Sequence, residues 1–375
     1  MLIEKKRIPV KDVLLYGLWP RLLKNIIYRL KGYRIGKKVK IGFGSVIIGD
    51  EISIGDETTI GFFTIIRGKQ INIGSHVSIG SITFIDTPYV KIGSGTKINE
   101  QVFVGGLQYP DSKFIVGRNC QIMQMCFINP AKSIVIGDDT GIGGDSLIFG
   151  HTSWLSKFEG YDVDFDDVEI GNSVSLAWRV FVLPGSKIGD GSVVGANSLV
   201  HRTIPPKSMA VGFPARVVRK QPDFPRELTR EDKANILEHI IQDMLDFFLG
   251  HEIGCKRIND ETLIVSRHKK SFFGQRTDSW RIHIIKQRLS ETVPAEGGME
   301  CDVLISLEEI PFIFKQFCSR NQVFWIDIEK KEQADMDDVL GSEIVSFLKR
   351  YGVRLNRVLP EKADFMWTSP KNVDG

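Results

Sequence analysis

Aliphatic side chains recur every six residues along most of the first 200 positions of the chain. They fall into groups of three, whose members we call rungs, and the groups begin at Ile35, Ile54, Ile73, Ile92, Val116, Ile136, Ile170 and Ile188. A period of six does not follow the stripe of an amphipathic helix, so the spacing indicates short strands separated by tight corners. The pattern predicts eight coils of three strands, stacked through parallel backbone hydrogen bonds into a three-sided column.

A second pattern agrees with the first. The residue four positions after each first and second rung is always small or β-branched, as expected where a side chain points into a narrow interior. These residues are Val39, Ser45, Thr58, Thr64, Val77, Thr83, Thr96, Val102, Cys120, Cys126, Thr140, Ser146, Val174, Val180, Ser192 and Ser198. Because Cys120 and Cys126 belong to this set, we expect both to pack as small apolar residues and to have no chemical role.

Two insertions interrupt the repeat, one after Val104 and one after Ile148. Both follow a third rung, so they are expected to leave the column at the same edge. The longer insertion, residues 149–168, carries His151 near its start, and loops held by a rigid scaffold are common positions for catalytic groups. Because imidazole can accept a proton near neutral pH, His151 is the candidate general base.

The length of 375 residues and the hydrophobic content of 42% are sufficient for two folded units. We expect an N-terminal helical capping segment over residues 1–34, the β-column over 35–220, and a C-terminal α+β domain over 221–375, beginning at a proline-containing linker. Residues 10–31 mix aliphatic with basic side chains. We expect them to close the open end of the column, with peripheral contact to an anionic membrane surface as the alternative.

The charge balance and the cysteines exclude several functional classes. With 49 basic and 46 acidic residues the net charge is +3, which is too balanced for a protein that neutralises nucleic-acid phosphates. The five cysteines are odd in number and contain no CxxC pair, which argues against a disulfide framework and against a zinc site. We therefore expect a cytoplasmic protein that holds no metal, and we find no segment that could cross a bilayer.

The end of the repeat carries its most specific motifs. They are Val182-Leu183-Pro184-Gly185, then Ile-Gly-Asp-Gly-Ser-Val-Val-Gly-Ala over 188–196, then Ile204-Pro205-Pro206, then Val211-Gly212-Phe213-Pro214-Ala215-Arg216. Together with the repeat and the histidine-bearing loop, this region resembles the hexapeptide-repeat acyltransferases, a superfamily that includes sugar O-acetyltransferases. The resemblance covers residues 35 to about 220. It implies a left-handed parallel β-helix, a homotrimer, and acetyl-CoA as co-substrate with no permanently bound cofactor.

The resemblance also assigns site residues. By matching position, it places these residues around coenzyme A: Ala177, Trp178, Ala196, His201, Arg202, Gly212, Pro214, Arg216 and Arg219. Arginine suits such a site because guanidinium offers several donors to phosphate oxygens. It places Met123, Met125 and Trp154 with the acceptor. Since the chain has Met123-Gln124-Met125 where maltose-type enzymes of the superfamily have asparagines that hold the acceptor sugar, a different acceptor is expected.

These assignments predict direct acetyl transfer to the hydroxyl of a sugar or nucleotide sugar in surface-polysaccharide or glycan biosynthesis. A backbone N–H near Ala177 or Trp178 is expected to stabilise the oxyanion. The group that orients His151 stays open among a backbone carbonyl and the acidic residues Asp145, Glu159, Asp162, Asp164, Asp166 and Asp167.

Three other functions fit part of the sequence pattern. N-acetyl transfer to an amino-sugar nucleotide and a non-enzymatic β-helix scaffold remain alternatives. A zinc-dependent carbonic anhydrase would need several histidines around one metal. The histidines of the repeat, His76, His151 and His201, belong to the third, sixth and eighth coils and are too far apart to meet in one chain.

Overall fold

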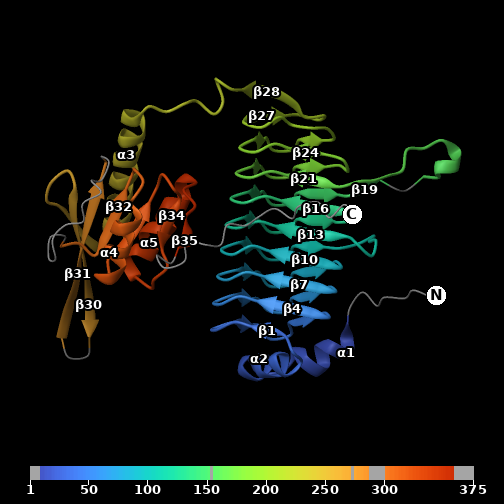
Figure 1. Cartoon of the computed structure of the whole chain (residues 1–375), viewed down its shortest axis with the longest axis horizontal. Coiled ribbons are helices and arrows are strands. Elements are labelled where there is room, and N and C mark those ends of the chain that lie inside the picture. The colour runs from blue at the N-terminus through green and yellow to red at the C-terminus, as the bar shows by residue number, and fades with distance from the viewer. Residues whose placement is uncertain (1–8, 153–154, 272–273, 287–299, 359–375) are drawn as a thin grey trace. The chain divides into compact units, whose positions relative to one another are not determined.

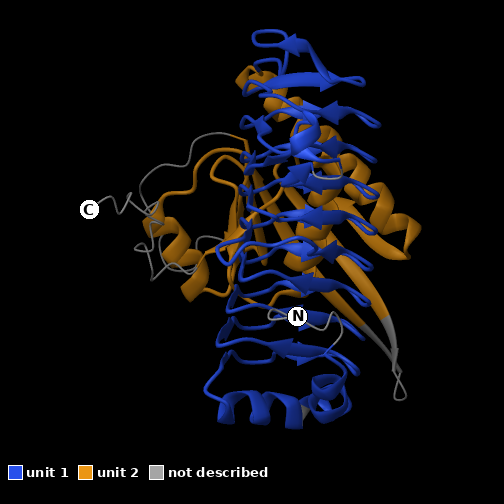
Figure 2. Ribbon diagram, turned by 90° about the vertical axis from the view of Figure 1, so that its right-hand side faces the viewer, with its two compact units in different colours: residues 1–227 blue, residues 228–375 orange. Residues whose placement is uncertain are grey.

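The computed structural model describes residues 9–152, 155–271, 274–286 and 300–358. The chain divides into two compact units, Met1–Glu227 and Leu228–Gly375, which Figure 2 shows in different colours. The boundary follows Glu227, whereas the sequence placed it at Gln221. Each unit has its own hydrophobic core, and each is described separately below.

Unit 1 is a column of parallel strands in three sheets (Figure 1). The first sheet contains β1 (Arg34–Ile35), β4 (Glu51–Ile54), β7 (Gln70–Ile73), β10 (Tyr89–Ile92), β13 (Lys113–Val116), β16 (Ser133–Ile136), β21 (Val168–Ile170) and β24 (Lys187–Ile188). The second contains β2 (Lys40–Ile41), β5 (Thr59–Ile60), β8 (Ser78–Ile79), β11 (Lys97–Ile98), β14 (Gln121–Ile122), β17 (Gly141–Ile142), β22 (Ser175–Leu176), β25 (Val193–Val194), β27 (Ser208–Val211) and β28 (Arg216–Lys220). The third contains β3 (Val46–Ile48), β6 (Ile65–Arg67), β9 (Phe84–Asp86), β12 (Phe103–Val104), β15 (Phe127–Asn129), β18 (Leu147–Phe149), β23 (Phe181–Val182) and β26 (Leu199–Val200).

Successive coils stack with matching residues opposite each other. Ile98 in β11, for example, lies opposite Ile79 of the preceding coil and Ile122 of the following one. All of the aliphatic rungs identified in the sequence lie in these strands and are buried, as are the sixteen small or β-branched positions. Burial raises the pKa of the Cys120 and Cys126 thiols to about 11, so both thiols remain protonated near neutral pH and pack as apolar groups.

The corners that follow the first and second strands of each coil share one backbone feature. Three residues after every first and second rung, φ is positive. These residues are Lys38, Gly44, Glu57, Phe63, His76, Ile82, Gly95, Gln101, Asn119, Met125, Asp139, Asp145, Ser173, Arg179, Gly191 and Asn197. A left-handed residue at a fixed position turns the chain sharply while the strands on either side stay in register. The corner after the third strand, which we call the third corner, is the one that varies in length.

The N-terminal end of the column is covered by α1 (Val10–Asp12), the π-helix η1 (Val13–Gly17) and α2 (Arg21–Leu30). Three polar side chains of α2, those of Lys24, Asn25 and Tyr28, form hydrogen bonds with the column. Lys24 Nζ donates to the carbonyls of Gly42 (2.5 Å) and Ser45 (3.1 Å), and Tyr28 Oη accepts from Ile47 N–H at 3.0 Å. This segment thus supplies hydrogen bonds to backbone groups that would have no partner at the end of a stack.

The buried amine of Lys24 makes this cap sensitive to pH. Burial lowers the pKa of Lys24 from 10.5 to about 8. Between pH 8 and pH 10.5 the Lys24 amine is protonated in the unfolded chain but neutral in the folded chain. The contribution of Lys24 to the free energy of unfolding therefore rises with pH over this range. We expect the wild-type protein to gain about 2 kcal/mol relative to Lys24→Met between pH 8 and pH 10. Urea unfolding at both pH values measures this difference.

A control for this prediction is Lys40→Met, which removes an exposed lysine from the adjacent strand. Its stability relative to the wild-type protein should not change over the same range. If the free energies of unfolding of Lys24→Met and the wild-type protein differ by the same amount at both pH values, the lowered pKa of Lys24 is contradicted.

Unit 2 is an α+β fold built on a sheet of seven strands in the order β29-β30-β31-β32-β33-β34-β35. The strands are β29 (Ile253–Arg257), β30 (Thr262–Ser271), β31 (Gly274–Ile285), β32 (Val303–Ser306), β33 (Phe324–Asp327), β34 (Glu332–Ala334) and β35 (Asn356–Val358). The helices are α3 (Arg230–Gly250), α4 (Phe312–Arg320), α5 (Val339–Leu348) and the 3₁₀ turn η3 (Lys349–Tyr351). Of the helices in the described ranges, none has the length and apolar character needed to cross a membrane.

Candidate functional site

The two insertions meet at the third corner. Residues 105–112 follow β12, and residues 150–167 follow β18 and contain β19 (His151–Thr152), the 3₁₀ turn η2 (Lys157–Glu159) and β20 (Asp164–Phe165). The rings of Tyr109, from the shorter insertion, and Phe165, from the longer, meet edge to face with centroids 5.6 Å apart. The sequence prediction that both loops leave the same edge therefore agrees with the structure.

His151 is held in place by its backbone and by aromatic rings. β19 pairs with β20 in antiparallel fashion, and His151 lies opposite Phe165. The imidazole lies nearly parallel to the Phe149 ring (centroids 6.0 Å apart, 9° between planes), and Phe165 approaches at 6.1 Å and 64°. The residue is half-buried. A ring held between two aromatic neighbours has little freedom to rotate, which suits a group that must receive a proton from a defined direction.

Within the described part of the chain, no hydrogen-bond partner is found for the buried Nδ1 atom of His151. The nearby acids are engaged elsewhere: an Asp167 carboxylate oxygen accepts from Ser133 N–H at 2.7 Å, and Asp145 lies 3.5 Å from the Arg179 guanidinium. In the described residues, therefore, no carboxylate orients this histidine. Its environment is aromatic on both sides.

A row of outward-facing aromatic side chains runs along the third sheet on both sides of His151. We call it the aromatic row; its members are Phe84, Phe103, Phe127, Phe149 and Phe181. Neighbouring rings lie 4.9 to 5.5 Å apart from centroid to centroid. Phe149, the fourth member of this row, also contacts His151. The histidine thus sits where the row passes from the earlier coils to the later ones.

Each side of the row opens into a cavity. The first, which we call the aromatic pocket, measures about 950 Å³ and is lined by Phe84, Phe103 and Phe127, by the 106–110 loop and by the third corners of the earlier coils. The second, which we call the Phe213 pocket, measures about 460 Å³. It is lined by Asp145, Leu147, Arg179, Phe181, Asn197, Ser198 and Phe213. Phe149 therefore links the two cavities, because it contacts Phe127 of the aromatic pocket and Phe181 of the Phe213 pocket.

The residues predicted to surround coenzyme A lie in the last two coils and the β27–β28 hairpin. Trp178 and Ala196 occupy corners after β22 and β25, beside the Phe213 pocket residues Arg179 and Asn197. Gly212 and Pro214 flank Phe213, which lines the same pocket. His201 and Arg202 follow β26, while Arg216 and Arg219 lie exposed on β28.

The backbone around Ala177 narrows the choice of oxyanion donor. Ala177 N–H donates to Val194 O at 2.9 Å in the stack of coils. This hydrogen bond holds the column together, so Ala177 cannot also supply a free donor. Of the two positions suggested by the sequence, the N–H of Trp178 is the one that stays a candidate.

Two of the predicted acceptor residues lie at a different corner from His151 within the chain. Met123 and Met125 lie at the corner between β14 and β15, and the strand β15 separates them from the third corner that carries His151. Met123 contacts Asn99 and Gln121 through its sulfur, and Met125 is 56% exposed. Trp154 lies outside the described residues. Toward the earlier coils, Phe149 contacts Phe127 of the aromatic row, and Tyr109 of the 105–112 insertion contacts Phe165.

Sequence reasoning missed the aromatic row, although a signal was present. Phe84, Phe103, Phe127 and Phe181 each directly precede a third rung, so they share one register position in four different coils. A residue next to an inward rung must point outward. Repetition of an aromatic residue at an outward position predicts a row on the surface.

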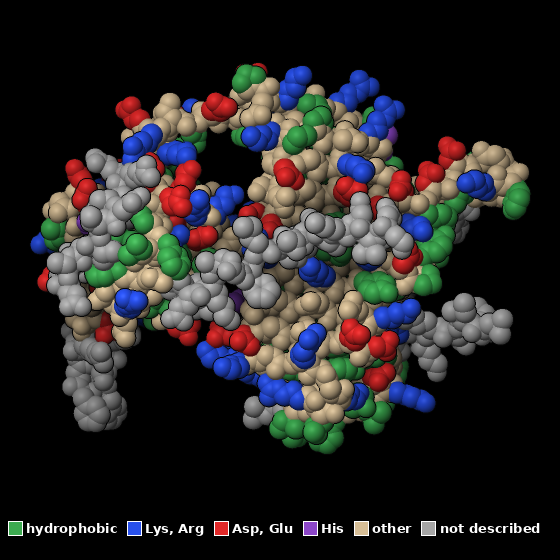
Figure 3. Space-filling view, in the orientation of Figure 1, with side chains coloured by type: hydrophobic (Ala, Val, Ile, Leu, Met, Phe, Trp, Pro, Cys, Tyr) green, Lys and Arg blue, Asp and Glu red, His purple; other side chains and the backbone are tan. Residues whose placement is uncertain are grey.

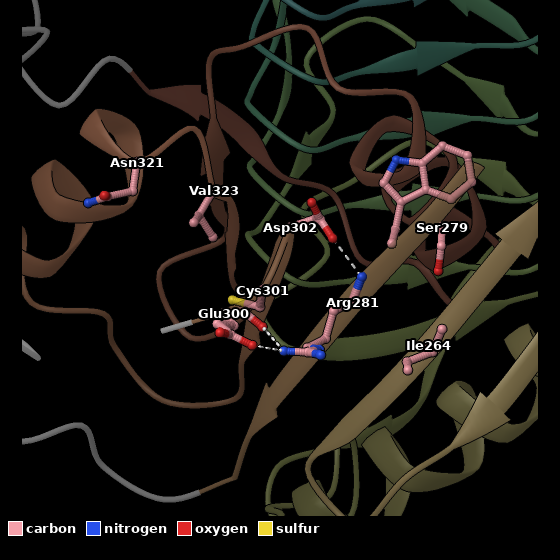
Figure 4. Close-up of a pocket in the computed structure, with 9 residues that line it drawn as sticks. Ile264, Ser279, Arg281, Glu300, Cys301, Asp302, Asn321 and Val323 are labelled. Carbon is pink, nitrogen blue, oxygen red and sulfur yellow. Dashed lines mark hydrogen bonds and ion pairs between the residues drawn. The ribbon is translucent and has the colours of Figure 1, made fainter. Parts of the chain in front are cut away.

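Unit 2 contains a further cavity of about 450 Å³, shown in Figure 4. Its charged residues satisfy one another: Arg281 Nη1 lies 2.6 Å from Glu300 Oε2, and Arg281 N–H donates to Asp302 at 2.6 Å. Burial raises the pKa of the Cys301 thiol to about 12, so this sulfur is protonated at neutral pH. No cluster of metal-binding side chains occurs among the residues that the structure describes.

Curated relatives match part of the chain. "Putative acetyltransferase SAV2555" of Staphylococcus aureus strain Mu50 is 37% identical over 121 residues, which are 31% of this chain and 60% of that protein. The "Putative lipopolysaccharide biosynthesis O-acetyl transferase WbbJ" of Escherichia coli K12 is 34% identical over 113 residues, 27% of this chain and 58% of that protein. The chain resembles the hexapeptide-repeat acyltransferases. It spans about three fifths of the length of these relatives, and no family model matches it.

Solved structures of this superfamily are also similar. The hexapeptide-repeat acetyltransferase VCA0836 of Vibrio cholerae, complexed with acetyl coenzyme A, is 17% identical, with 56% of this chain and 84% of that chain covered and a TM-score of 0.25. The UDP-N-acetylglucosamine acyltransferase of Arabidopsis is also 17% identical, with 54% and 76% covered and a TM-score of 0.33. At these scores, neither structure bears on the substrate or assembly of this chain.

Proposed function

We propose that the chain transfers an acetyl group from acetyl-CoA to a sugar hydroxyl, as an O-acetyltransferase of surface-polysaccharide or glycan biosynthesis. The observation that carries this proposal is the position of Phe149, which lies against His151 and contacts Phe127 of the aromatic pocket and Phe181 of the Phe213 pocket. A two-substrate transfer needs such an arrangement, because the base must reach the acceptor hydroxyl while the thioester lies beside it. The names of the relatives, acetyltransferases and a lipopolysaccharide O-acetyl transferase, support the same chemistry.

The proposed reaction is a direct transfer. His151 takes the proton of the acceptor hydroxyl as its oxygen attacks the thioester carbonyl, and the Trp178 N–H stabilises the oxyanion that forms. When this tetrahedral species collapses, the carbon–sulfur bond breaks, and the sulfur leaves with the proton that the imidazole had received. The products are an acetyl ester and coenzyme A, and no covalent enzyme intermediate forms.

On the donor side, we place the pantetheine arm in the Phe213 pocket. Trp178, Ala196, His201 and Arg202 line its approach, while Gly212 and Pro214 meet the adenine. Arg216 and Arg219 have exposed guanidinium groups on β28 that can bind the nucleotide phosphates. In this proposal the column is a left-handed parallel β-helix.

The test is the release of free thiol from acetyl-CoA in the presence of a panel of sugars, nucleotide sugars and their amino forms. Release that depends on a hydroxyl acceptor supports O-acetylation. Thiol release with amino sugars alone indicates N-acetylation. Thiol release no faster than hydrolysis of acetyl-CoA in buffer without the protein indicates a scaffold without enzymatic activity.

An exposed apolar stripe supports a homotrimer. Large apolar side chains recur at the corner between the second and third strands of the first, second, third, fifth and seventh coils, and all are exposed. They are Phe43, Phe62, Phe63, Ile82, Met125 and Trp178. A contiguous apolar surface of this kind on a rigid column is typical of an interface, and we propose that it packs against the neighbouring copies of the chain.

The outer face of the N-terminal cap supports peripheral membrane contact. Leu14, Leu15, Leu18, Trp19, Leu23, Ile26 and Leu30 are 40 to 83% exposed although the same segment buries Lys24 and Tyr28. Figure 3 shows hydrophobic side chains gathered over this end of the column. The exposed basic residues Lys11, Arg21 and Lys31 border the face. Aliphatic and tryptophan side chains with basic neighbours fit an anionic lipid surface.

Vesicle co-sedimentation tests this contact. We expect the full chain to bind vesicles that contain phosphatidylglycerol, and to bind them less at high salt because the basic residues are then screened. The double variant Leu18→Glu/Ile26→Glu should lose at least about tenfold in binding, since two apolar anchors are removed. As a control, Ile258→Glu changes an exposed isoleucine of unit 2 and should bind normally. Equal binding by the wild-type protein and the double variant would contradict membrane contact.

A further inference from the structure

We infer that the aromatic pocket binds a neutral glycan of several sugar units that lies along the column, with the unit to be acetylated at the Phe127 end. This inference rests on the proposed function and specifies its acceptor.

The pocket is elongated along the column axis. Its lining starts at Ile48 in the first coil, passes through Arg67 and Phe84 in the second and third coils, and ends at Phe127 in the fifth. Four coil steps of about 4.8 Å give a length of about 19 Å. The volume of about 950 Å³ lies at the upper end of the range for small-molecule sites. A single sugar ring would fill only part of this space.

One end of the pocket reaches the histidine. Phe127 stacks on Phe149 with centroids 5.5 Å apart, and Phe149 lies against His151. On the opposite wall, Tyr109 of the pocket contacts Phe165, which in turn contacts His151. A ligand that fills the pocket therefore ends at Phe127 and Tyr109, each separated from the imidazole by one aromatic ring, and the rest of the ligand extends over the earlier coils.

The polar groups of the pocket match sugar hydroxyls better than a hydrocarbon chain. Arg67 and Asp86 form an ion pair at its floor, with their side chains 13% and 9% exposed. Gln108 Nε2 donates to the Asp86 carbonyl and fixes the loop above the pair. Together these side chains can both donate to and accept from vicinal hydroxyls. A hydrocarbon tail would remove water from these groups without replacing its hydrogen bonds.

The charges of the pocket argue against a phosphorylated ligand. Arg67 and Lys69 are matched by Asp50 and Asp86, so the lining carries no excess of positive charge. A phosphate or polyanion would be attracted by a basic excess. Apolar ring edges from Phe84 and Phe103, together with paired charges, fit the mixed surface of a neutral sugar chain.

The experiment is a binding measurement that does not involve acetyl-CoA. The labelled full chain is applied to an array of neutral glycans from monosaccharides to hexasaccharides, with phosphorylated glycans included. We expect binding that strengthens with the number of sugar units. The inference is overturned if monosaccharides bind as well as longer chains, if only phosphorylated glycans bind, or if no glycan binds.

The variant Phe84→Ala removes a ring far from His151, and we expect it to weaken binding of the longest glycan about tenfold, equivalent to roughly 1.4 kcal/mol. Ile65→Ala is its matched control: Ile65 occupies the same position in the preceding coil but does not line the pocket, so its binding should be normal. Equal binding by both variants overturns the inference. Gln108→Ala, in the loop, gives a second reading if Phe84→Ala fails to fold, and it should also weaken binding.

The two proposals fail in different ways. Loss of thiol release with every acceptor removes the proposed activity but leaves array binding unchanged. Transfer to single sugars with no gain from longer chains retains the activity and removes the extended glycan site.

Discussion

Replacing His151 with alanine is expected to lower the rate of acetyl transfer by a factor of about 10² to 10⁴, the usual contribution of a general base. The hydroxyl would then attack without a group to take its proton. The fold should be retained, because His151 lies in an insertion outside the hydrophobic core of the column. Steady-state measurement of thiol release under saturating acetyl-CoA gives the effect, and binding of coenzyme A by calorimetry should be unchanged.

A suitable control is His76→Asn, which changes a histidine at a corner of the third coil. His76 has a positive φ of 56°, a conformation that asparagine also tolerates. This variant should have the activity of the wild-type protein. If His151→Ala also turns over at a near-normal rate, the histidine has no part in the chemistry, and the base must be sought elsewhere along the third corner.

The second large effect is expected from Ile98→Asp. Ile98 is completely buried in the middle of the column, and an aspartate there would leave a carboxylate or carboxylic acid without partners in an apolar interior. We expect a loss of about 4 kcal/mol or more in the free energy of unfolding of unit 1, a large part of the stability of an ordinary domain. Thermal unfolding followed by circular dichroism and limited proteolysis measures it.

Lys97→Asp provides the matched comparison, because Lys97 is the neighbouring residue of the same strand and is exposed. The same side chain is introduced one position away, but into water, so the stability should change by less than about 0.5 kcal/mol. Unit 2 has a separate core, and its unfolding should not change in either variant. Similar destabilisation by the two substitutions would mean that the interior of the column is not where the six-residue pattern places it.

The column could be predicted from sequence because its constraint is local and repeated. An inward rung and a small inward residue recur in every coil, so each coil is an independent observation of one geometry. Rungs such as Ile98 therefore lie in strands, as expected, and the capping role of residues 10–31 also agrees with the structure. The burial of Lys24 was not foreseen, since a lysine in an amphipathic segment is usually solvated.

The site was harder to predict because it depends on contacts between loops. The sequence placed both insertions at one edge, but it did not show that Tyr109 and Phe165 meet there. The resemblance directed attention to Met123 and Met125, which lie at another corner. For unit 2 the sequence predicted the α+β class alone, because short strands such as β34 and β35 carry little periodicity and α4 places only a few residues in the core.

The uniform corners after the first and second strands limit where the chain can accept inserted residues. An extra residue at either corner would shift every later strand of that coil against its neighbours, whereas the third corner already accommodates loops of different lengths. Natural variation and laboratory exchange of segments can therefore act at one edge of the column and leave the stacking elsewhere intact. Replacing the 105–112 loop of this chain with the corresponding loop of a relative would then change the acceptor preference without redesign of the column.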